Sequence, residues 1–198
     1  MNKIEIQKNT KKWFEQWILK LNLCPFAHAV DAQEQIRFEI EESDDFKKCV
    51  QKAVSEIDFL IEHDSDSHSE DERMENDTKY YIDTTLLVFP NQTDFKDSFE
   101  DFLDFVALLD LYLEQNELDT EFQLVAFHPN FIFEVEELNS KSHYTNRSPY
   151  PTLHILREKS VQKGTESFGN VALIPQKNIE KLEKMKDADF EWLKSFQK

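Results

Sequence analysis

The feature that most constrains this chain is an alternation of short apolar strands and amphipathic helices in its central part. The strands are predicted at residues 36–40, 84–89 and 122–127, and the helices between them at residues 46–61 and 95–113. The first strand alternates apolar and polar residues, and the helices repeat apolar residues at a spacing of three or four. This order predicts an α/β fold, with α+β as the alternative, in which helices pack on a small parallel or mixed sheet of about three strands.

Further helices are predicted at both ends of the chain. An N-terminal helix is expected over Thr10–Leu21, where aromatic and aliphatic residues recur on one face. It ends before Pro25, because proline disfavours the helical conformation in the preceding residue. Another helix, with proline in its first turn, is expected from Tyr150 to about Ser160. A C-terminal helix is expected from about Pro175.

The domain organisation is predicted to be simple. The 198 residues fit a single domain, 1–198, which is large enough to bury a core without a disulfide or a metal. Residues 63–79 are acidic and show no apolar periodicity. Such a segment cannot bury enough apolar surface to offset the entropy lost on ordering, so we predict an acidic, mobile loop insertion there.

The charge balance argues against several classes of partner. The chain has 40 acidic and 23 basic residues, a formal net charge of −17, and such a surface repels nucleic acids and anionic membranes. The N-terminal sequence lacks the apolar run of a signal peptide, and no stretch reaches membrane-spanning length. We therefore expect a cytoplasmic protein that binds neither nucleic acid nor membrane. No pattern indicates the oligomeric state or a cofactor.

Cys24 and His128 are the candidate catalytic residues. Cys24 follows the N-terminal helix and is interpreted either as a nucleophile or redox thiol, or as a small buried apolar residue. The helix C-terminus before it works against a thiolate. His128 lies at the end of a predicted strand, before a proline turn. An imidazole there suits acid–base catalysis or metal ligation, and alternatively forms hydrogen bonds to the turn.

The run YTNRSPYPTLH, residues 144–154, concentrates rigid and polar side chains before the helix predicted from Tyr150. Unpaired N–H groups at a helix N-terminus bind anions, and Arg147 beside them adds a bidentate guanidinium. His154 falls in the first turns of that helix. The run predicts a pocket for the carboxylate or phosphate group of a small molecule. The alternative is a loop that caps its own helix and pairs Arg147 with surface acids.

Several blocks of sequence resemble a known family. They are LNLCPFA (21–27), TTLLVFP (84–90), AFHPNFIF (126–133), YTNRSPYPTLHILRE (144–158) and, more weakly, IPQKNIEKL (174–182). Together they resemble the domain-of-unknown-function family numbered fourteen-fifteen. The resemblance implies a single compact α/β-type domain and supplies no activity. Its motif positions in this chain are Asn22, Cys24, His128, Asn146, Arg147, His154 and Asn178, of which all but Cys24 and His128 are predicted to bind substrate.

Three classes of function follow from these observations. The leading hypothesis is a small-molecule enzyme, with Cys24 as nucleophile, His128 as acid or base and Arg147 as the anchor of an anionic substrate. The second is a module that binds a transition metal or haem through Cys24, His128 and His154. The third is a non-enzymatic structural or interaction protein.

Overall fold

The computed structural model describes residues 2–64, 81–168 and 171–194. Of the predicted acidic loop insertion at residues 63–79, only the first two residues fall within these ranges, and the rest lies outside the described residues. Among the described residues, none of the helices combines the length and the apolar character needed to cross a bilayer.

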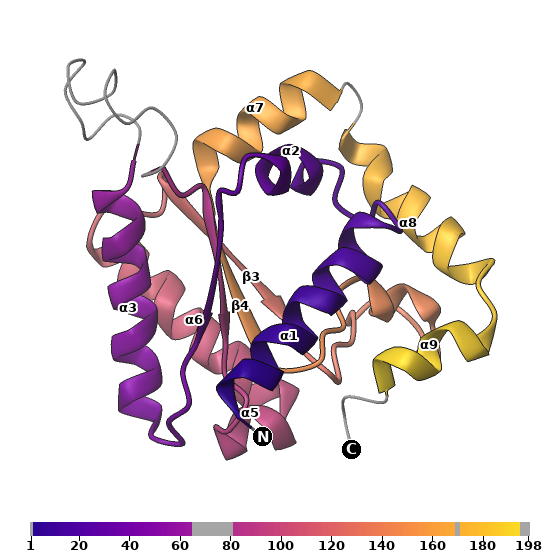
Figure 1. The fold of residues 1–198 in the computed structure, drawn as a ribbon, viewed down its shortest axis with the longest axis horizontal. Helices are drawn as coiled ribbons and strands as arrows, with labels where there is room; N and C mark the ends of the chain where they lie inside the picture. The colour runs from indigo at the N-terminus through magenta and orange to yellow at the C-terminus, as the bar shows by residue number, and fades with distance from the viewer. Residues whose placement is uncertain (1, 65–80, 169–170, 195–198) are drawn as a thin grey trace.

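A four-stranded mixed sheet lies at the centre of the fold (Figure 1). Its strands are β1 (Ile36–Ile40), β2 (Thr84–Val88), β3 (Phe122–Phe127) and β4 (Thr152–Arg157). Their order across the sheet is β1-β2-β4-β3, with β1 parallel to β2 and β4 antiparallel to both its neighbours. The predicted α/β class is therefore confirmed, and the three predicted strands form at their predicted positions.

The fourth strand corrects a prediction. The helix expected from Tyr150 to Ser160 is wrong, because Thr152–Arg157 form β4 between β2 and β3. Leu153 and Ile155 pack into the core on one face of the sheet, whereas His154 faces the other side. Since both faces of a central strand are covered, apolar residues occur on both, with Leu153 and Ile155 on one face and Leu156 on the other, and the sequence shows no clear alternation. The helix α7 (Glu158–Phe168) begins only where β4 ends.

Two helices, α3 (Phe46–Glu62) and α6 (Phe99–Gln115), cover one face of the sheet. The predicted helix at 95–113 is divided by Ser98, which has an extended backbone and accepts a hydrogen bond from the Asp101 N–H at 3.1 Å. Ser98 thus ends the short α5 (Thr93–Asp97) and caps α6. Between these helices and the sheet, phenylalanine rings pack edge to face, as Phe89 and Phe105 do at 5.2 Å.

The N-terminal segment covers the opposite face. The helix α1 (Lys3–Trp13) continues directly into a π-helix, Phe14–Leu19. The helix predicted over Thr10–Leu21 therefore begins earlier and ends in a wider turn. Trp13 and Trp17, one α-helical turn apart, are both buried against the sheet and the C-terminal part of the chain.

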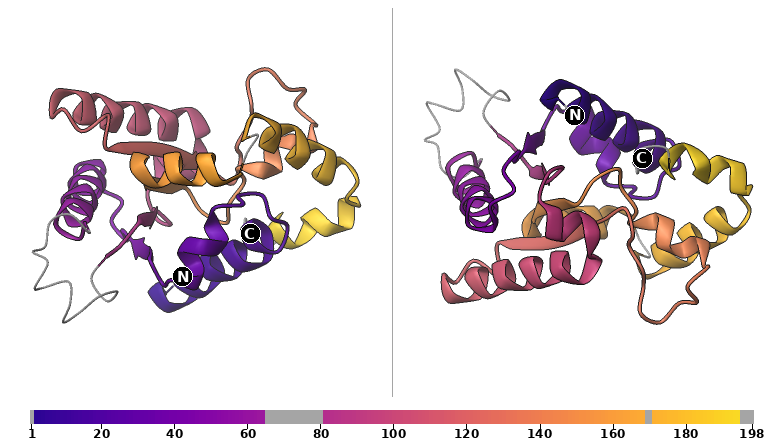
Figure 2. Two further views of the ribbon diagram at one scale, coloured as in Figure 1. Left: turned by 90° about the horizontal axis from the view of Figure 1, so that it is seen from above. Right: turned by 90° about the horizontal axis from the view of Figure 1, so that it is seen from below.

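The remaining helices lie beside the N-terminal segment. They are α2 (Ala27–Ala32), the 3-10 helices Lys141–Thr145 and Val171–Leu173, α8 (Ile174–Glu183) and α9 (Asp187–Lys194). The predicted helix from about Pro175 is confirmed by α8. Figure 2 shows α8 and α9 on the far side of α1 from α3, so the C-terminal helices extend the layer that covers the α1 face of the sheet.

Candidate functional site

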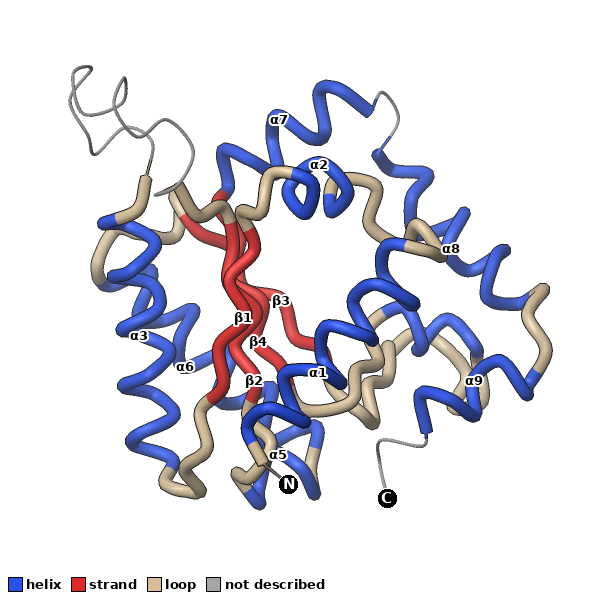
Figure 3. The backbone as a smooth tube through the Cα atoms, viewed as in Figure 1, coloured by secondary structure: helices blue, strands red, loops and turns tan. Residues whose placement is uncertain are grey.

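A cavity of about 260 Å³ lies between the sheet and the segment formed by α1 and the π-helix, two parts of the chain that Figure 3 shows face to face. Its apolar walls are formed by Trp13, Phe14, Ile18, Leu23, Phe26, Ala27, Leu86, Val125, Phe127, Leu156 and Val161. Its polar lining consists of Cys24, Gln123, Thr145, Asn146 and His154. We call this cavity the apolar pocket. It brings together three of the residues singled out in the sequence, namely Cys24, Asn146 and His154.

His154 forms part of the floor of the apolar pocket. It stands in the middle of β4, opposite Val125 on β3 and Leu86 on β2. The ring borders the cavity, and its Nε2 atom is buried and has no hydrogen-bond partner. Burial lowers the pKa of His154 to about 4, so the imidazole is neutral at neutral pH. A neutral imidazole nitrogen without a partner can donate or accept one hydrogen bond, depending on its tautomer.

Cys24 lies in the wall of the same pocket, between the π-helix and α2. Burial raises the pKa of its thiol, while hydrogen bonds with the backbone of Ala27 and Phe26 act in the opposite direction. The thiol is therefore protonated at neutral pH. Because His154 Nε2 has no partner, this thiol does not hydrogen-bond it. The two groups share one cavity as neutral, separate side chains.

The loop that carries Cys24 is held by donors from α8. Asn178 donates from Nδ2 to the Leu23 carbonyl at 2.8 Å, and Lys181 donates from Nζ to the carbonyls of Leu21 and Asn22. Asn22 itself has a left-handed backbone, with a φ of 49°, and its side chain is exposed. Neither Asn22 nor Asn178 lines the apolar pocket. Their observed contacts instead shape the loop before Cys24.

The loop at residues 144–147 is held in the same way by the N-terminal helix. Trp13 donates from Nε1 to the Arg147 carbonyl at 2.9 Å, and Trp17 donates to the Tyr144 carbonyl at 2.8 Å. Asn146, which lines the pocket, donates from Nδ2 to the Ala126 carbonyl at 3.3 Å. These bonds tie the loop both to α1 and to the end of β3.

Arg147 does not line the apolar pocket. Its guanidinium carbon lies 4.3 Å from the centre of the Tyr144 ring, and its Nε donates to the Phe131 carbonyl at 3.3 Å. Since residues 152–157 form a strand, the helix N-terminus expected beside Arg147 is absent, and that element of the predicted anion site is wrong.

His128 is fully buried on the other side of the sheet, close to Phe99 and Phe102 of α6. Its Nδ1 accepts from the Asn130 N–H at 3.0 Å, so Nε2 carries the proton and donates to the Phe95 carbonyl at 2.6 Å. Burial lowers the pKa of His128. Both ring nitrogens are thus engaged in the protein, and His128 and Cys24 are not brought together.

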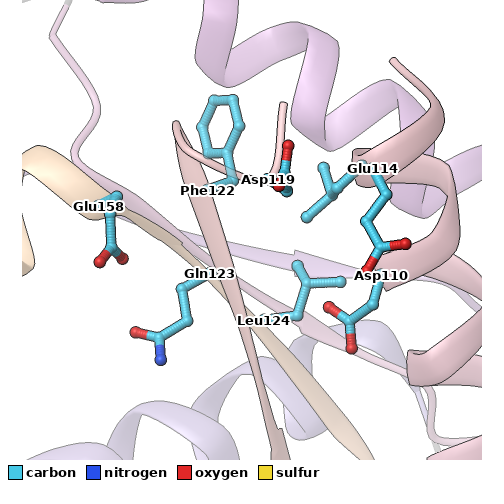
Figure 4. A pocket seen from close by; sticks show the side chains of 8 residues that line it. Asp110, Glu114, Asp119, Phe122, Gln123, Leu124 and Glu158 are labelled. Carbon is cyan, nitrogen blue, oxygen red and sulfur yellow. The ribbon is translucent and has the colours of Figure 1, made fainter. Parts of the chain in front are cut away.

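A second hollow, of about 410 Å³, lies between the C-terminal end of α6 and β3. Asp110, Glu114, Asp119 and Glu158 contribute carboxylates to it (Figure 4). Glu158 lies apart from the neighbouring pair Asp110 and Glu114 in this view. Within the described part of the chain, no group of three or more His, Cys, Asp and Glu side chains is arranged to hold a metal ion.

Sequence reasoning missed the aromatic walls of the apolar pocket and also Gln123. The aromatic residues of the first helix fit the pattern of an ordinary core-facing stripe, which does not reveal that Trp13 and Phe14 border a cavity. Gln123 offered a weak signal, because it is the one polar residue in the strand sequence FQLVAF. It lines both the apolar pocket and the second hollow, and Figure 4 shows it on the opposite side of β3 from Leu124.

The comparison with known proteins confirms the resemblance seen in the motifs. Residues 5–192 match the family model described as "Protein of unknown function (DUF1415)". The match spans every residue that lines the apolar pocket and also α8, which holds the loop before Cys24. No curated protein and no solved structure matches the chain.

Replacing Asn178 with alanine is expected to destabilise the protein by about 1–3 kcal/mol, because it leaves the buried Leu23 carbonyl without a donor. Urea unfolding measures the change. The matched control is Asn139→Ala on the exposed 131–140 loop, for which we expect less than about 0.5 kcal/mol. Equal losses in the two variants would contradict the role assigned to Asn178.

The stability of the protein is expected to fall between pH 6.5 and 4 in a way that depends on His154. The unfolded imidazole has its ordinary pKa of 6.5 and the folded one a pKa of about 4, so in this window the unfolded state binds more protons. The loss begins below pH 6.5, saturates below pH 4 and amounts to about 3 kcal/mol. Between pH 7 and 4, wild type should therefore lose about 3 kcal/mol more unfolding free energy than His154→Leu, as measured by urea unfolding. Equal losses in the two proteins would contradict the assignment.

Proposed function

The chain belongs to the family of proteins of unknown function DUF1415, and we propose that its function is to bind a small, uncharged molecule in the apolar pocket. This molecule has a largely apolar, planar body and one hydrogen-bonding group that meets His154. The single observation that carries the proposal is the buried Nε2 of His154, which has no hydrogen-bond partner.

The energetics of His154 support a ligand at this place. A buried polar group without a partner costs about 1–3 kcal/mol, and a ligand that supplies the missing bond recovers that free energy on binding. A water molecule bound there would need several polar partners. The side chains opposite His154 on both neighbouring strands, Val125 and Leu86, are apolar. An apolar molecule with one polar group therefore suits the surroundings of Nε2 better than water does.

The dimensions and lining of the pocket indicate the class of ligand. An engineered apolar cavity of about 150 Å³ accommodates benzene, so about 260 Å³ has room for a somewhat larger molecule, on the order of ten non-hydrogen atoms. The rings of Trp13, Phe14, Phe26 and Phe127 favour an aromatic body. A hydroxyl group both donates and accepts, so it satisfies either tautomer of His154. A phenol is the simplest molecule that meets these requirements.

The anionic ligand expected from Arg147 stays a separate prediction. An unpaired carboxylate inside an apolar cavity is unfavourable, and the neutral His154 supplies no positive charge to offset it. Arg147 could still hold an anion outside this cavity, where its guanidinium lies over Tyr144. Benzoate, which has the body of a phenol and a negative charge, distinguishes the two ligand classes.

A second candidate function is an enzyme that uses Cys24 on the bound molecule. The specific observation in its favour is that Cys24 lines the same cavity as His154, with the backbone hydrogen bonds of Phe26 and Ala27 partly opposing the effect of burial on its thiol. The neutral imidazole of His154 could take up a proton once a ligand brings the groups into contact. His128, whose ring nitrogens are engaged elsewhere, has no part in this version of the enzyme hypothesis.

A cytoplasmic location is part of the proposal. Both cysteines, Cys24 and Cys49, are free thiols. Free thiols are usual in a reducing compartment. In such a compartment Cys24, in the wall of the pocket, would remain a thiol.

Calorimetric titration with phenol, toluene and benzoate tests the binding proposal. Wild type should bind phenol about tenfold more tightly than toluene, because one hydrogen bond to His154 is gained, and benzoate should bind most weakly. His154→Leu should lose the preference for phenol and retain the wild-type affinity for toluene. The control His28→Leu, at an exposed position on α2, should behave as wild type. The proposal fails if wild type binds neither phenol nor toluene, or if His154→Leu keeps the preference.

Alkylation with iodoacetamide tests the role of Cys24. We expect Cys24 to react at least about tenfold faster than Cys49, because Cys49 is fully buried and its pKa is raised to about 12. Phenol should slow the reaction at Cys24 alone. Peptide mapping by mass spectrometry after timed quenching gives both rates in one sample. If both thiols are inert in the folded protein, the enzyme hypothesis is abandoned while the binding proposal stands.

A further inference from the structure

We infer that Gly164 of α7 determines how large a ligand the apolar pocket accepts, although Gly164 does not itself line the pocket. It acts through the ring of Phe26, which stands between α7 and the cavity. The inference rests on the proposed binding function and adds to it a residue that determines specificity.

The first observation is the closeness of Gly164 to Phe26. A Cβ atom at position 164 would lie 2.6 Å from Cδ1 of Phe26, 2.9 Å from its Cγ and 3.0 Å from its Cε1. Carbon atoms that are not bonded to each other pack at about 3.5–4.0 Å. The Phe26 ring therefore occupies the space that any larger residue at position 164 would need.

The second observation is that Phe26 has the cavity beside it. The Phe26 side chain lines the apolar pocket, and so does Val161, which lies three residues before Gly164 on α7. The ring thus has α7 on one side and the cavity on another. A methyl group at position 164 pushes the ring away from α7, and the cavity is the open space into which it can turn. The volume left for a ligand then decreases.

The competing response is a movement of α7 itself. The helix α2 has no buried residue, and none of the described side chains of α7 is buried, so neither helix is anchored as firmly as α3 or α6. A rotation of one aromatic side chain requires less rearrangement than the displacement of a helix that continues directly from β4. We therefore expect the ring, rather than the helix, to give way. Rotation of the Phe26 ring reduces the space for a large ligand, whereas movement of α7 leaves that space unchanged or enlarges it.

Paired titrations with phenol and naphthol test the inference on the full-length protein. Wild type should bind both. Gly164→Ala should bind phenol within about twofold of wild type and lose about tenfold or more in naphthol affinity, as expected for overpacking at one wall. The double variant G164A/F26A should regain naphthol binding, because the ring that was displaced is gone. The control Glu166→Ala, at an exposed position of the same helix, should bind both as wild type does.

The outcomes separate the inference from the function on which it rests. If wild type binds neither molecule, the proposed function fails and the inference with it. If wild type binds both and Gly164→Ala is unchanged or improved toward naphthol, α7 has moved instead and only the inference fails. Failure of the double variant to recover naphthol binding also overturns it. A further variant, Phe26→Leu, leaves Gly164 in place and should raise the affinity for naphthol relative to phenol by several-fold; an unchanged ratio contradicts the inference.

Discussion

Backbone carbonyl groups in two partly buried loops require hydrogen-bond donors, and distant parts of the chain are arranged to supply them. The loop before Cys24 receives donors from Asn178 and Lys181 of α8. The loop at residues 144–147 receives the indole N–H groups of Trp13 and Trp17. A buried carbonyl without a partner costs about as much as a typical hydrogen bond or more. These bonds therefore fix the position of both loops relative to the sheet.

The apolar pocket is a consequence of this arrangement. Trp13 both donates to the Arg147 carbonyl and forms part of the pocket wall, so one side chain joins loop and cavity. Asn146 has the same double role, because it bonds the end of β3 and lines the pocket. The cavity is thus enclosed by elements whose positions are set independently of any ligand. Hydrogen bonds within the protein hold this part of the wall in place, and the buried Nε2 of His154 lies without a partner in the same pocket.

Sequence reasoning identified β1, β2, β3 and the core helices because their signals are local. The strands at residues 36–40 and 122–127 have the predicted bounds. It misread β4, since the prolines and polar residues before Thr152 are typical of a helix start, and a strand with both faces buried shows no alternation. Its place between β2 and β3 depends on pairing with residues that are distant in sequence. With β4 misplaced, the position of His154 in the pocket could not be predicted.

The candidate site was predictable only in part, for a related reason. The strand end at His128 is visible in the sequence, but its ring nitrogens bond Phe95 and Asn130, and no local pattern reveals the contact with Phe95. The family motifs include Cys24, Asn146 and His154, which border the apolar pocket, and also His128, which lies on the other side of the sheet. They did not distinguish side chains that border a cavity from side chains that hold a loop, because both kinds depend on the same fold. Asn178 is of the second kind and His154 of the first.

Nitrogen-15 NMR of the histidine rings tests the central claim most directly. His128 and His143 each have both ring nitrogens in hydrogen bonds within the protein, and they serve as internal references for His154. On addition of phenol, the account predicts that the Nε2 resonance of His154 moves, while those of His128 and His143 stay in place. Phenol binding that leaves His154 unchanged, or that shifts all three rings alike, would contradict the account.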